Sequence, residues 1–373
     1  GILKGLIATG CLTERYREVL AEEIPELDAV IGTGDFAKIA QVIDEIRRGE
    51  KRPVLYGNIE IPYQEQVKRK IDPNATHAFI KIAEGCDNHC TYCIIPKLRG
   101  RYKSRKIEPI VEEARLLAQQ GIREIILIAQ DTALYGIDQY GEVAFPKLLR
   151  ELDQIQELKW IRFLYAYPEN VSDELIRTVK NAKRIVPYFD MPFQHTEDRI
   201  LKLMGRKTTK TKLFSLVEKI RSEIPHAVIR TTLISGFPTE TDEEHRQMLE
   251  AVKALKINKL GVFAYSKEED TAAANMKGQI DADRKMERQA QVMEVQRLVS
   301  QQVLEQYRGE EFEVLIESYE NGEYVGRTWM DAPEIDGEVL LETDCECTRG
   351  DWVKATITDT TDFDLIAALK MKS

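Results

Sequence analysis

The run Glu84-Gly85-Cys86-Asp87-Asn88-His89-Cys90-Thr91-Tyr92-Cys93 holds the three cysteines, Cys86, Cys90 and Cys93, that decide the fold of this chain. Their spacing, C-x-x-x-C-x-x-C, brings three thiolates within reach of one iron-sulfur cube and leaves the fourth iron without a protein ligand. A structural zinc site usually needs four ligands, commonly as two separated pairs. The spacing therefore predicts a cluster with an open iron. Because His89 or His77 could supply a fourth ligand, zinc stays open as an alternative.

The composition is typical of a soluble protein of two or three domains. The chain has 373 residues, of which 43% are hydrophobic and 31% are charged, ordinary values for that class. Its apolar runs are shorter than the roughly 18 to 20 residues that span a bilayer. Nothing at the start resembles a signal peptide, and six cysteines do not form a disulfide framework in a chain of this length. We therefore predict a protein of the reducing cytoplasm with no membrane partner. Because Gly1 adjoins an expected strand, we also expect the sequence to begin partway through a domain.

The charge is concentrated at the C-terminal end. Residues 309–373 contain seventeen acidic and five basic residues, a net charge of −12, whereas the whole chain carries −10. The preceding 308 residues are left with +2. An acidic module repels phosphate and attracts basic partners, so we expect little RNA binding through this segment.

The hydrophobic pattern predicts three domains, 1–72, 73–308 and 309–373. The first is a small α/β unit followed by a polar linker. Its expected elements are strands at Ile2 to Ala8 and Ala29 to Ile31 and helices at Glu14 to Glu23 and Asp35 to Arg48.

Residues 73–308 alternate short apolar runs with stretches of helical periodicity, which is typical of strand-helix units around a parallel sheet. The expected strands are Ala78 to Ile82, Glu124 to Ala129, Trp160 to Tyr165, Tyr188 to Pro192, Val228 to Ser235 and Leu260 to Ala264. The expected helices between them include Val111 to Gln120, Asp173 to Asn181, Lys210 to Glu223 and Asp242 to Leu255. Six units indicate a full or partial barrel. Because active sites of such folds gather at the carboxyl ends of the strands, the cysteines that follow the first strand should lie at the catalytic end.

A long helix at Asp281 to Tyr307 closes the second domain, and the third is all-β in pattern. Its expected strands are Glu311 to Ser318, Glu323 to Thr328, Gly337 to Glu342 and Asp351 to Thr358, with Asn321-Gly322 as a hairpin turn. Such a segment fits a small closed barrel. Cys345 and Cys347 fall in a strand-like stretch, where alternation places both on one face. We expect buried small side chains there and assign them no function.

Polar residues at the strand ends are candidates for holding a cofactor and a substrate. They are Gln130, Asp131, Tyr165, Tyr167, Gln194, His195 and Gly236 to Pro238. Our cofactor-binding candidates are Tyr92, Gln130, Gln194, Ser235 and Gly236. The alternative is that barrel rims carry polar residues without a ligand, and that His195 is a hydrogen-bonded structural histidine. Cys11, between an expected strand and helix, is favoured as a thiolate there, although a lone cysteine is usually structural.

The cysteine loop, with an aromatic residue before its last cysteine, resembles the signature of radical S-adenosylmethionine (SAM) enzymes. The resemblance implies a partial or full strand-helix barrel, a 4Fe-4S cluster on the three cysteines, and SAM chelated to the open iron. It also implies reductive cleavage of SAM to a deoxyadenosyl radical that abstracts hydrogen from carbon.

Over the whole chain the sequence is similar to the methylthiotransferases of this superfamily, which join an α/β domain, a radical core and a C-terminal TRAM barrel. Thr9-Gly10-Cys11 resembles the last of three cysteines that bind a second 4Fe-4S cluster, and the other two would lie upstream of residue 1. The segments Asp190 to His195, Leu203 to Arg206 and Ile234 to Pro238 also resemble family segments. At Thr239 the family often has Gly.

Within the family, Ala129 to Thr132 and Ala332 to Gly337 resemble the RimO branch, which modifies ribosomal protein S-twelve, more than the tRNA-modifying MiaB branch. The resemblance implies methylthiolation of an aspartate β-carbon with two SAM molecules per turnover, and an electron donor such as flavodoxin or ferredoxin. The acidic C-terminal module agrees with a basic ribosomal protein as partner. Two alternatives stay open: the tRNA-modifying enzyme, and a non-enzymatic cluster or zinc adaptor that recruits a basic protein.

Overall fold

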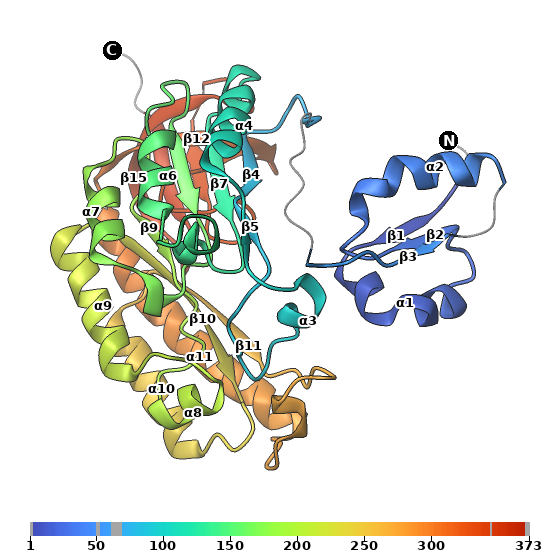
Figure 1. The fold of residues 1–373 in the computed structure, drawn as a ribbon. Helices are drawn as coiled ribbons and strands as arrows, with labels where there is room; N and C mark the ends of the chain where they lie inside the picture. Colours follow the sequence, from blue (N-terminus) through green and yellow to red (C-terminus); the bar gives the residue numbers. More distant parts are fainter. Residues whose placement is uncertain (1–2, 50–52, 61–68, 344, 370–373) are drawn as a thin grey trace.

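The computed structural model describes residues 3–49, 53–60, 69–343 and 345–369. Figure 1 shows an N-terminal lobe (blue) beside a large α/β core, and a C-terminal barrel (red) behind the strands of that core. No helix among these residues is both long and apolar enough to cross a bilayer. The predicted fold class, an α/β partial barrel between an α/β piece and a small all-β barrel, is confirmed.

The N-terminal lobe is a three-stranded parallel sheet between two helices. Its strands β1 (Ile7–Thr9), β2 (Ala29–Ile31) and β3 (Val54–Leu55) pair in that order. Helices α1 (Cys11–Glu23) and α2 (Ile39–Arg47) cover opposite faces of the sheet, because Val30 packs beside α1 whereas Ala29 and Ile31 pack beside α2. The first strand begins later than predicted, with residues 1–2 outside the described residues, and β3 was not predicted.

Six parallel strands form the large α/β core. They are β4 (His77–Lys81), β7 (Glu124–Ile128), β8 (Trp160–Phe163), β9 (Tyr188–Asp190), β10 (Val228–Ser235) and β11 (Lys259–Ala264). The order is β4-β7-β8 in one sheet and β9-β10-β11 in the next, with a parallel bridge between Ile161 and Ile185 where the sheets meet. The edge strands are β4 and β11, so the barrel is partial.

Helices cover the outer face of these strands, and alternation along each strand separates the two faces. Ile125 and Leu127 of β7 pack among the helices, whereas Ile126 packs against the C-terminal barrel. The covering helices are α4 (Ile107–Gln119), α6 (Phe145–Leu152), α7 (Asp173–Asn181), α9 (Lys210–Glu223), α10 (Asp242–Leu255) and α11 (Ala282–Leu304). Shorter elements are β5 (Ala83–Glu84), β6 (Lys103–Ser104), α3 (Ile95–Arg99), α5 (Ile137–Tyr140) and α8 (Asp198–Leu203). Leucine and isoleucine therefore build a core on the helix side, and the C-terminal barrel packs against the inner face.

The C-terminal barrel closes in the order β12-β13-β14-β16-β15. Its strands are β12 (Glu311–Glu320), β13 (Glu323–Arg327), β14 (Val339–Glu342), β15 (Trp352–Thr360) and β16 (Leu365–Leu369). Asn321 and Gly322 have φ of 53° and 93°, the left-handed pair that a tight hairpin turn requires. The predicted strand at Cys345 and Cys347 is wrong: both lie in a loop between β14 and β15, and Cys345 is exposed.

Buried ion pairs fix the barrel to the inner face of the core. The Arg327 guanidinium donates to Glu124 at 2.6 Å, and Arg162 donates to the other oxygen of Glu124 at 3.0 Å. Burial opposes the charged form of Glu124, but Arg327 and Arg162 more than offset it, so the pKa of this carboxyl is lowered. Two further pairs join Lys259 to Asp331 at 2.5 Å and Arg230 to Asp336 at 3.4 Å. Part of the acidic charge of the barrel is therefore used in docking.

Candidate functional site

The cysteine loop follows β5, at the carboxyl end of β4, where the sequence predicted it. Cys86 and Cys90 are buried, Cys93 is partly buried, and all three thiols are free. The backbone N–H of Asn88 donates to Cys86 Sγ, and that of Ile95 donates to Cys93 Sγ, each at 3.4 Å. Such N–H···S bonds stabilise thiolate charge, as a cluster-binding loop requires.

The segment Leu203 to Arg206 holds this loop in place. Thr91 donates its backbone N–H to Met204 O at 3.0 Å and its hydroxyl to Leu203 O at 2.8 Å. Gly205 has φ of 75°, and a Cβ there would lie 2.7 Å from His89 O. Only glycine allows the backbone of residue 205 to come this close to His89. The segment Leu203 to Arg206, which the sequence analysis named, therefore supports the cysteine loop.

Three cysteines at this spacing are the donor set of an iron-sulfur cube. Among the described residues, no three His, Cys, Asp or Glu side chains converge closely enough to hold one metal ion. In an iron-sulfur cube each cysteine binds a different iron, so wider spacing is required. His77 begins β4, at the other end of the strand, and lies 4.0 Å from Glu317, away from the cysteines. Burial raises the pKa of Cys86 to about 11, so metal binding must displace a proton there.

Several buried polar atoms near the loop have no hydrogen-bond partner. They are Tyr92 Oη, Gln130 Oε1, Ser235 Oγ, and Nε and Nη1 of Arg206. Unpaired buried polar atoms cost about 1–3 kcal/mol each, so a polar ligand that pairs with them would recover that cost. Three of our five candidate cofactor residues are among them.

Left-handed backbone conformations recur at three strand ends. Tyr165, Gln194 and Gly236 follow β8, β9 and β10 with φ of 60°, 71° and 74°. A Cβ on Gly236 would lie 2.4 Å from the Lys285 side chain. This position therefore requires glycine for two reasons, the left-handed φ and the close contact. Such strain in non-glycine residues costs about 1–3 kcal/mol and concentrates at functional sites.

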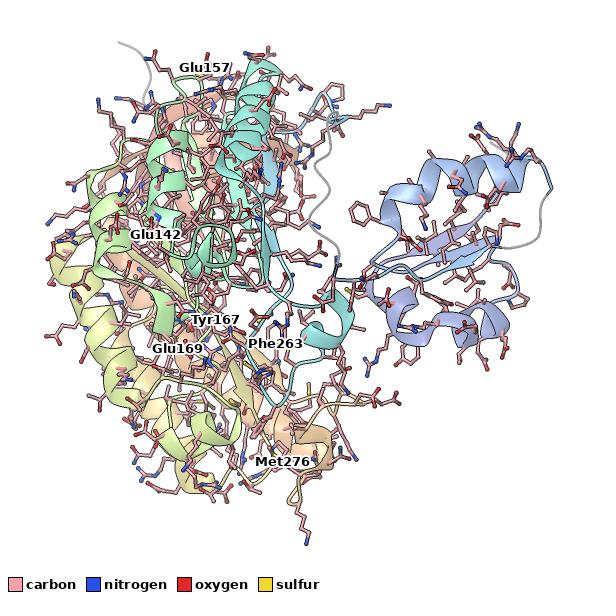
Figure 2. All side chains as sticks on the ribbon, in the orientation of Figure 1. Glu142, Glu157, Tyr167, Glu169, Phe263 and Met276 are labelled. Carbon is pink, nitrogen blue, oxygen red and sulfur yellow. The ribbon has the colours of Figure 1, made fainter. Side chains whose placement is uncertain are left out.

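Tyr167 and Arg206 form a pair beside the cysteine loop. Tyr167 Oη lies 3.8 Å from Cys90 Sγ, and the Arg206 guanidinium stacks 4.1 Å from the Tyr167 ring while it pairs with Glu169 at 3.0 Å. Figure 2 labels Tyr167 and Glu169, which lie close to each other in that view. Sequence reasoning named Tyr167 but not Arg206 as a candidate, since a charged residue after a helix carries no signal of its own.

Two family profiles match the chain. The profile of the Radical SAM superfamily matches residues 80–252, and that of the TRAM domain matches residues 309–369. Full-length relatives agree. A ribosomal protein uS12 methylthiotransferase RimO from Thermoanaerobacter sp. is 50% identical over 98% of this chain and 83% of its own length. Proteins of the same name from Caldanaerobacter subterraneus and Clostridioides difficile are 50% and 45% identical over 95% and 98% of the chain, and over 81% and 82% of their own lengths.

The chain belongs to the RimO family. The predictions of a radical SAM methylthiotransferase and of an enzyme are confirmed, and the non-enzymatic adaptor is excluded. The RimO-family fold also resembles two solved structures of the radical SAM methyltransferase TsrM from Kitasatospora setae, one with a SAM analogue and tryptophan, the other with a 4Fe-4S cluster and cobalamin. Their TM-scores are 0.53 and 0.54 at 17% and 18% identity, covering 69% and 70% of this chain and 55% and 56% of theirs. This likeness concerns the fold.

His195 of this RimO-family chain has the surroundings of a structural residue. It is fully buried, its Nδ1 accepts the Glu197 N–H at 3.0 Å, and its Nε2 lies 3.4 Å from Glu240. Glu240 in turn accepts the backbone N–H of Gly236 at 2.9 Å and that of Phe237 at 3.3 Å. His195 and Glu240 thus hold the turn after β10, and no sequence signal identified Glu240.

Cys11 lies in the N-terminal lobe of the RimO fold, at the start of α1 as expected. Arg99 of α3 donates to Cys11 Sγ at 3.1 Å. The role of Cys11 in a second cluster stays a prediction.

Proposed function

We propose that this chain adds a methylthio group to the β-carbon of an aspartate in ribosomal protein uS12, the S-twelve protein named above, with two SAM molecules per turnover. The observation that carries the proposal is the 45–50% identity, over at least 95% of the chain, to relatives named for uS12 methylthiolation. The site supports it, because three cysteines and unpaired buried polar atoms lie together at the carboxyl ends of the barrel strands.

Cys86, Cys90 and Cys93 would hold the 4Fe-4S cluster. The backbone N–H groups of Asn88 and Ile95 stabilise the sulfur charge, and the hydroxyl of Tyr167 lies next to Cys90. When bound, the reduced cluster and SAM supply hydrogen abstraction from carbon and methyl transfer to sulfur.

Unpaired buried polar atoms support a binding role for the candidate residues and for Arg206. Gln130, Ser235 and Tyr92 offer an amide oxygen and two hydroxyl groups, and Arg206 offers a buried cation with two unpaired nitrogens. Gln194 and Gly236 complete the predicted set with left-handed turns that expose backbone to the same region. These groups suit the amino, carboxylate and ribose groups of SAM.

The sulfur-carrying half of the reaction is assigned to the N-terminal lobe. Cys11 supplies one ligand of a second 4Fe-4S cluster. A flavodoxin or ferredoxin is the proposed electron donor.

The exposed face of the C-terminal barrel is the proposed contact for uS12. Glu313, Asp331, Asp336 and Asp362 pair with bases of the core. The exposed acidic residues away from these pairs include Glu310, Glu320, Glu323, Glu342 and Glu346. Their charge attracts a basic ribosomal protein and repels tRNA phosphate.

Anaerobic reconstitution of the full-length protein with iron, sulfide, SAM and a reductant tests the proposal. We expect uS12 to gain the mass of one methylthio group on an aspartate, and tRNA to gain none. The variant Cys90→Ala is the matched negative control. A gain on tRNA without a gain on uS12 would assign the chain to the alternative tRNA-modifying activity.

Charge reversal tests the contact separately. Glu342→Lys with Glu346→Lys should weaken uS12 binding most at low salt, because exposed charges are screened as salt rises. The control Lys354→Glu on the same barrel should not weaken it. Equal binding by both variants at low salt would remove the barrel from the interface.

A further inference from the structure

A cavity of about 480 Å³ lies between the N-terminal lobe and the core. Thr9 and Gly10, directly before Cys11, line it on the side of the lobe. Lys81 of β4 and Ile128 of β7 line it on the side of the core, and they are paired in the sheet register. Their side chains therefore leave the same, inner face of the sheet, opposite the helices. The cavity connects the two parts of the molecule that carry cysteines.

Cations dominate the wall of this cavity. Of the eleven described residues that line it, four are basic and one, Glu113, is acidic. The basic residues are Arg69, Lys81, Arg99 and Arg105. Arg105 is itself buried and pairs with Glu113 at 2.7 Å. A partly enclosed cavity with several guanidinium groups favours a carboxylate or a phosphate.

Arg99 occupies the position between the two cysteine-bearing segments. Its Nε donates to Cys11 Sγ at 3.1 Å, and its Nη1 donates to Glu84, two residues before Cys86. Lys81 donates to the other oxygen of Glu84 at 3.1 Å. One guanidinium thus faces the cavity and touches both the lobe and the start of the cysteine loop.

We propose that this cavity binds the side-chain carboxylate of the target aspartate, with Arg99 and Lys81 as the recognising cations. The inference rests on the proposed function, because an aspartate carries its carboxylate on the carbon that is modified. A carboxylate held by Arg99 would lie beside the one guanidinium that contacts both Cys11 and Glu84, two residues before Cys86. The arrangement also gives specificity, since asparagine has the same shape but loses the charge-assisted hydrogen bonds.

A double-mutant binding cycle tests this contact. Fluorescence anisotropy measures the binding of uS12 to the full-length protein. The enzyme is either wild type or Arg99→Gln, and uS12 is either wild type or a variant with Asn in place of the modified aspartate. Each single change should weaken binding about tenfold or more, as expected for a hydrogen bond to a charged group. The two changes together should weaken it no further than either alone.

Arg101→Gln, an exposed arginine two residues further on, is the matched control and should leave the tenfold effect of the asparagine intact. Lys81→Gln is the second variant, for the case that Arg99→Gln loses its fold by circular dichroism. Fully additive effects for both variants would overturn the assignment. The assignment would also be overturned if RNA competed with uS12 for the wild-type protein but not for Arg99→Gln, because the cavity would then bind phosphate. If the wild-type protein fails to modify uS12, the proposed function fails; if it modifies uS12 and the cycle is additive, only this inference fails.

Discussion

Strand β7 joins two buried carboxyl groups that the protein treats in opposite ways. Glu124, at its start, is held by Arg162 and Arg327, and its pKa is lowered. Asp131, three residues past its end, accepts hydrogen bonds from Ala133 and Tyr167 N–H and from the Asn170 amide, without a cation. Burial raises the pKa of Asp131 to about 7.

The same contrast holds for the two ends of the barrel. At the amino ends of the strands, charges pair across the interface with the C-terminal barrel. At the carboxyl ends, polar atoms of Tyr92, Gln130, Ser235 and Arg206 stay without partners. The amino ends are not free of unpaired atoms, since Nη1 and Nη2 of Arg162 beside Glu124 also lack a partner. The difference lies in the charged pairs to the C-terminal barrel at one end and in the candidate ligand-binding groups at the other. Substitutions at the two ends should fail in different ways.

The largest effect is expected at the cysteine loop. Cys90→Ala removes one of three cluster ligands, so the reconstituted protein should lose its visible cluster absorption and reductive SAM cleavage should fall to background. The control is Cys345→Ala, because Cys345 is exposed in a loop of the C-terminal barrel. Retention of cluster and cleavage by Cys90→Ala would remove Cys90 from the ligand set. The global stability of the variant should change little by comparison.

Arg327→Met should have the largest effect on folding. It leaves Glu124 buried without one of its two cations, which costs about 3–5 kcal/mol in the free energy of unfolding. Urea denaturation measures the loss, and the double variant Glu124→Gln with Arg327→Met should recover part of it. Lys354→Met breaks an exposed 3.6 Å pair with Glu311 and should cost about 0–1 kcal/mol. Equal losses in the two variants would contradict the contrast between buried and exposed pairs.

The two carboxyl groups of β7 should give opposite pH dependences. The lowered pKa of Glu124 contributes stability that is present above its ordinary value of 4.5 and is lost as pH falls through the folded pKa. The folded pKa of Asp131 is about 7, above the ordinary 3.8, so the folded state keeps a proton that the unfolded state has lost. Its contribution therefore declines as pH rises from 3.8 to about 7.

Asp131→Asn should flatten this decline when the free energy of unfolding is compared at about pH 5 and about pH 8. The Asn170 amide can rotate to accept from the new side chain, so most hydrogen bonds survive the change. Asp44→Asn, on the exposed face of α2, is the control and should leave the pH profile as it is. An unchanged slope in Asp131→Asn would mean that Asp131 is ionised throughout.

The smallest effect is expected at Thr239, where the family often has Gly. Its φ is 69°, a left-handed conformation that costs a β-branched residue about 1 kcal/mol or more. Thr239→Gly should raise the free energy of unfolding by up to about 1 kcal/mol, reduced by the loss of the exposed hydrogen bond from Arg199. Thr239→Ala keeps the strain and should show no gain. A loss of stability in the glycine variant would show that the Arg199 contact outweighs the strain.

The sequence predicted the long elements well because local signals and burial agree there. The ranges for α7, α9 and α10 match the structure, and each helix begins after a side-chain cap, from Ser172, Thr209 or Thr241. Strand β10 also matches over all eight residues. Five of its eight residues are β-branched and a glycine follows its end, so both boundaries are visible in the pattern.

The missed features depend on contacts between distant parts of the chain. Strand β16 pairs with β14 and β15 in the closed barrel and carries little turn signal of its own. The stretch at Cys345 and Cys347 reads as a strand but has no partner strand in the barrel, so it forms a loop. Arg206 meets Tyr167 only through the fold. The cysteine spacing, in contrast, is local in the sequence. The cluster chemistry was therefore predictable, whereas the residues that surround the cysteine loop in the fold were not.

The contact of Glu124 with Arg327 also sets an order on synthesis. The two residues are separated by 203 positions, and the inner-face residues Ile126 and Trp160 are covered by the same barrel. At 5–20 residues per second, the ribosome needs on the order of 10 to 40 s to deliver Arg327 after Glu124. During that interval the nascent core has an uncovered apolar face and a carboxylate without its second cation. We therefore expect the core to mature last at its inner face, after the C-terminal barrel has emerged, and to depend on chaperones until then.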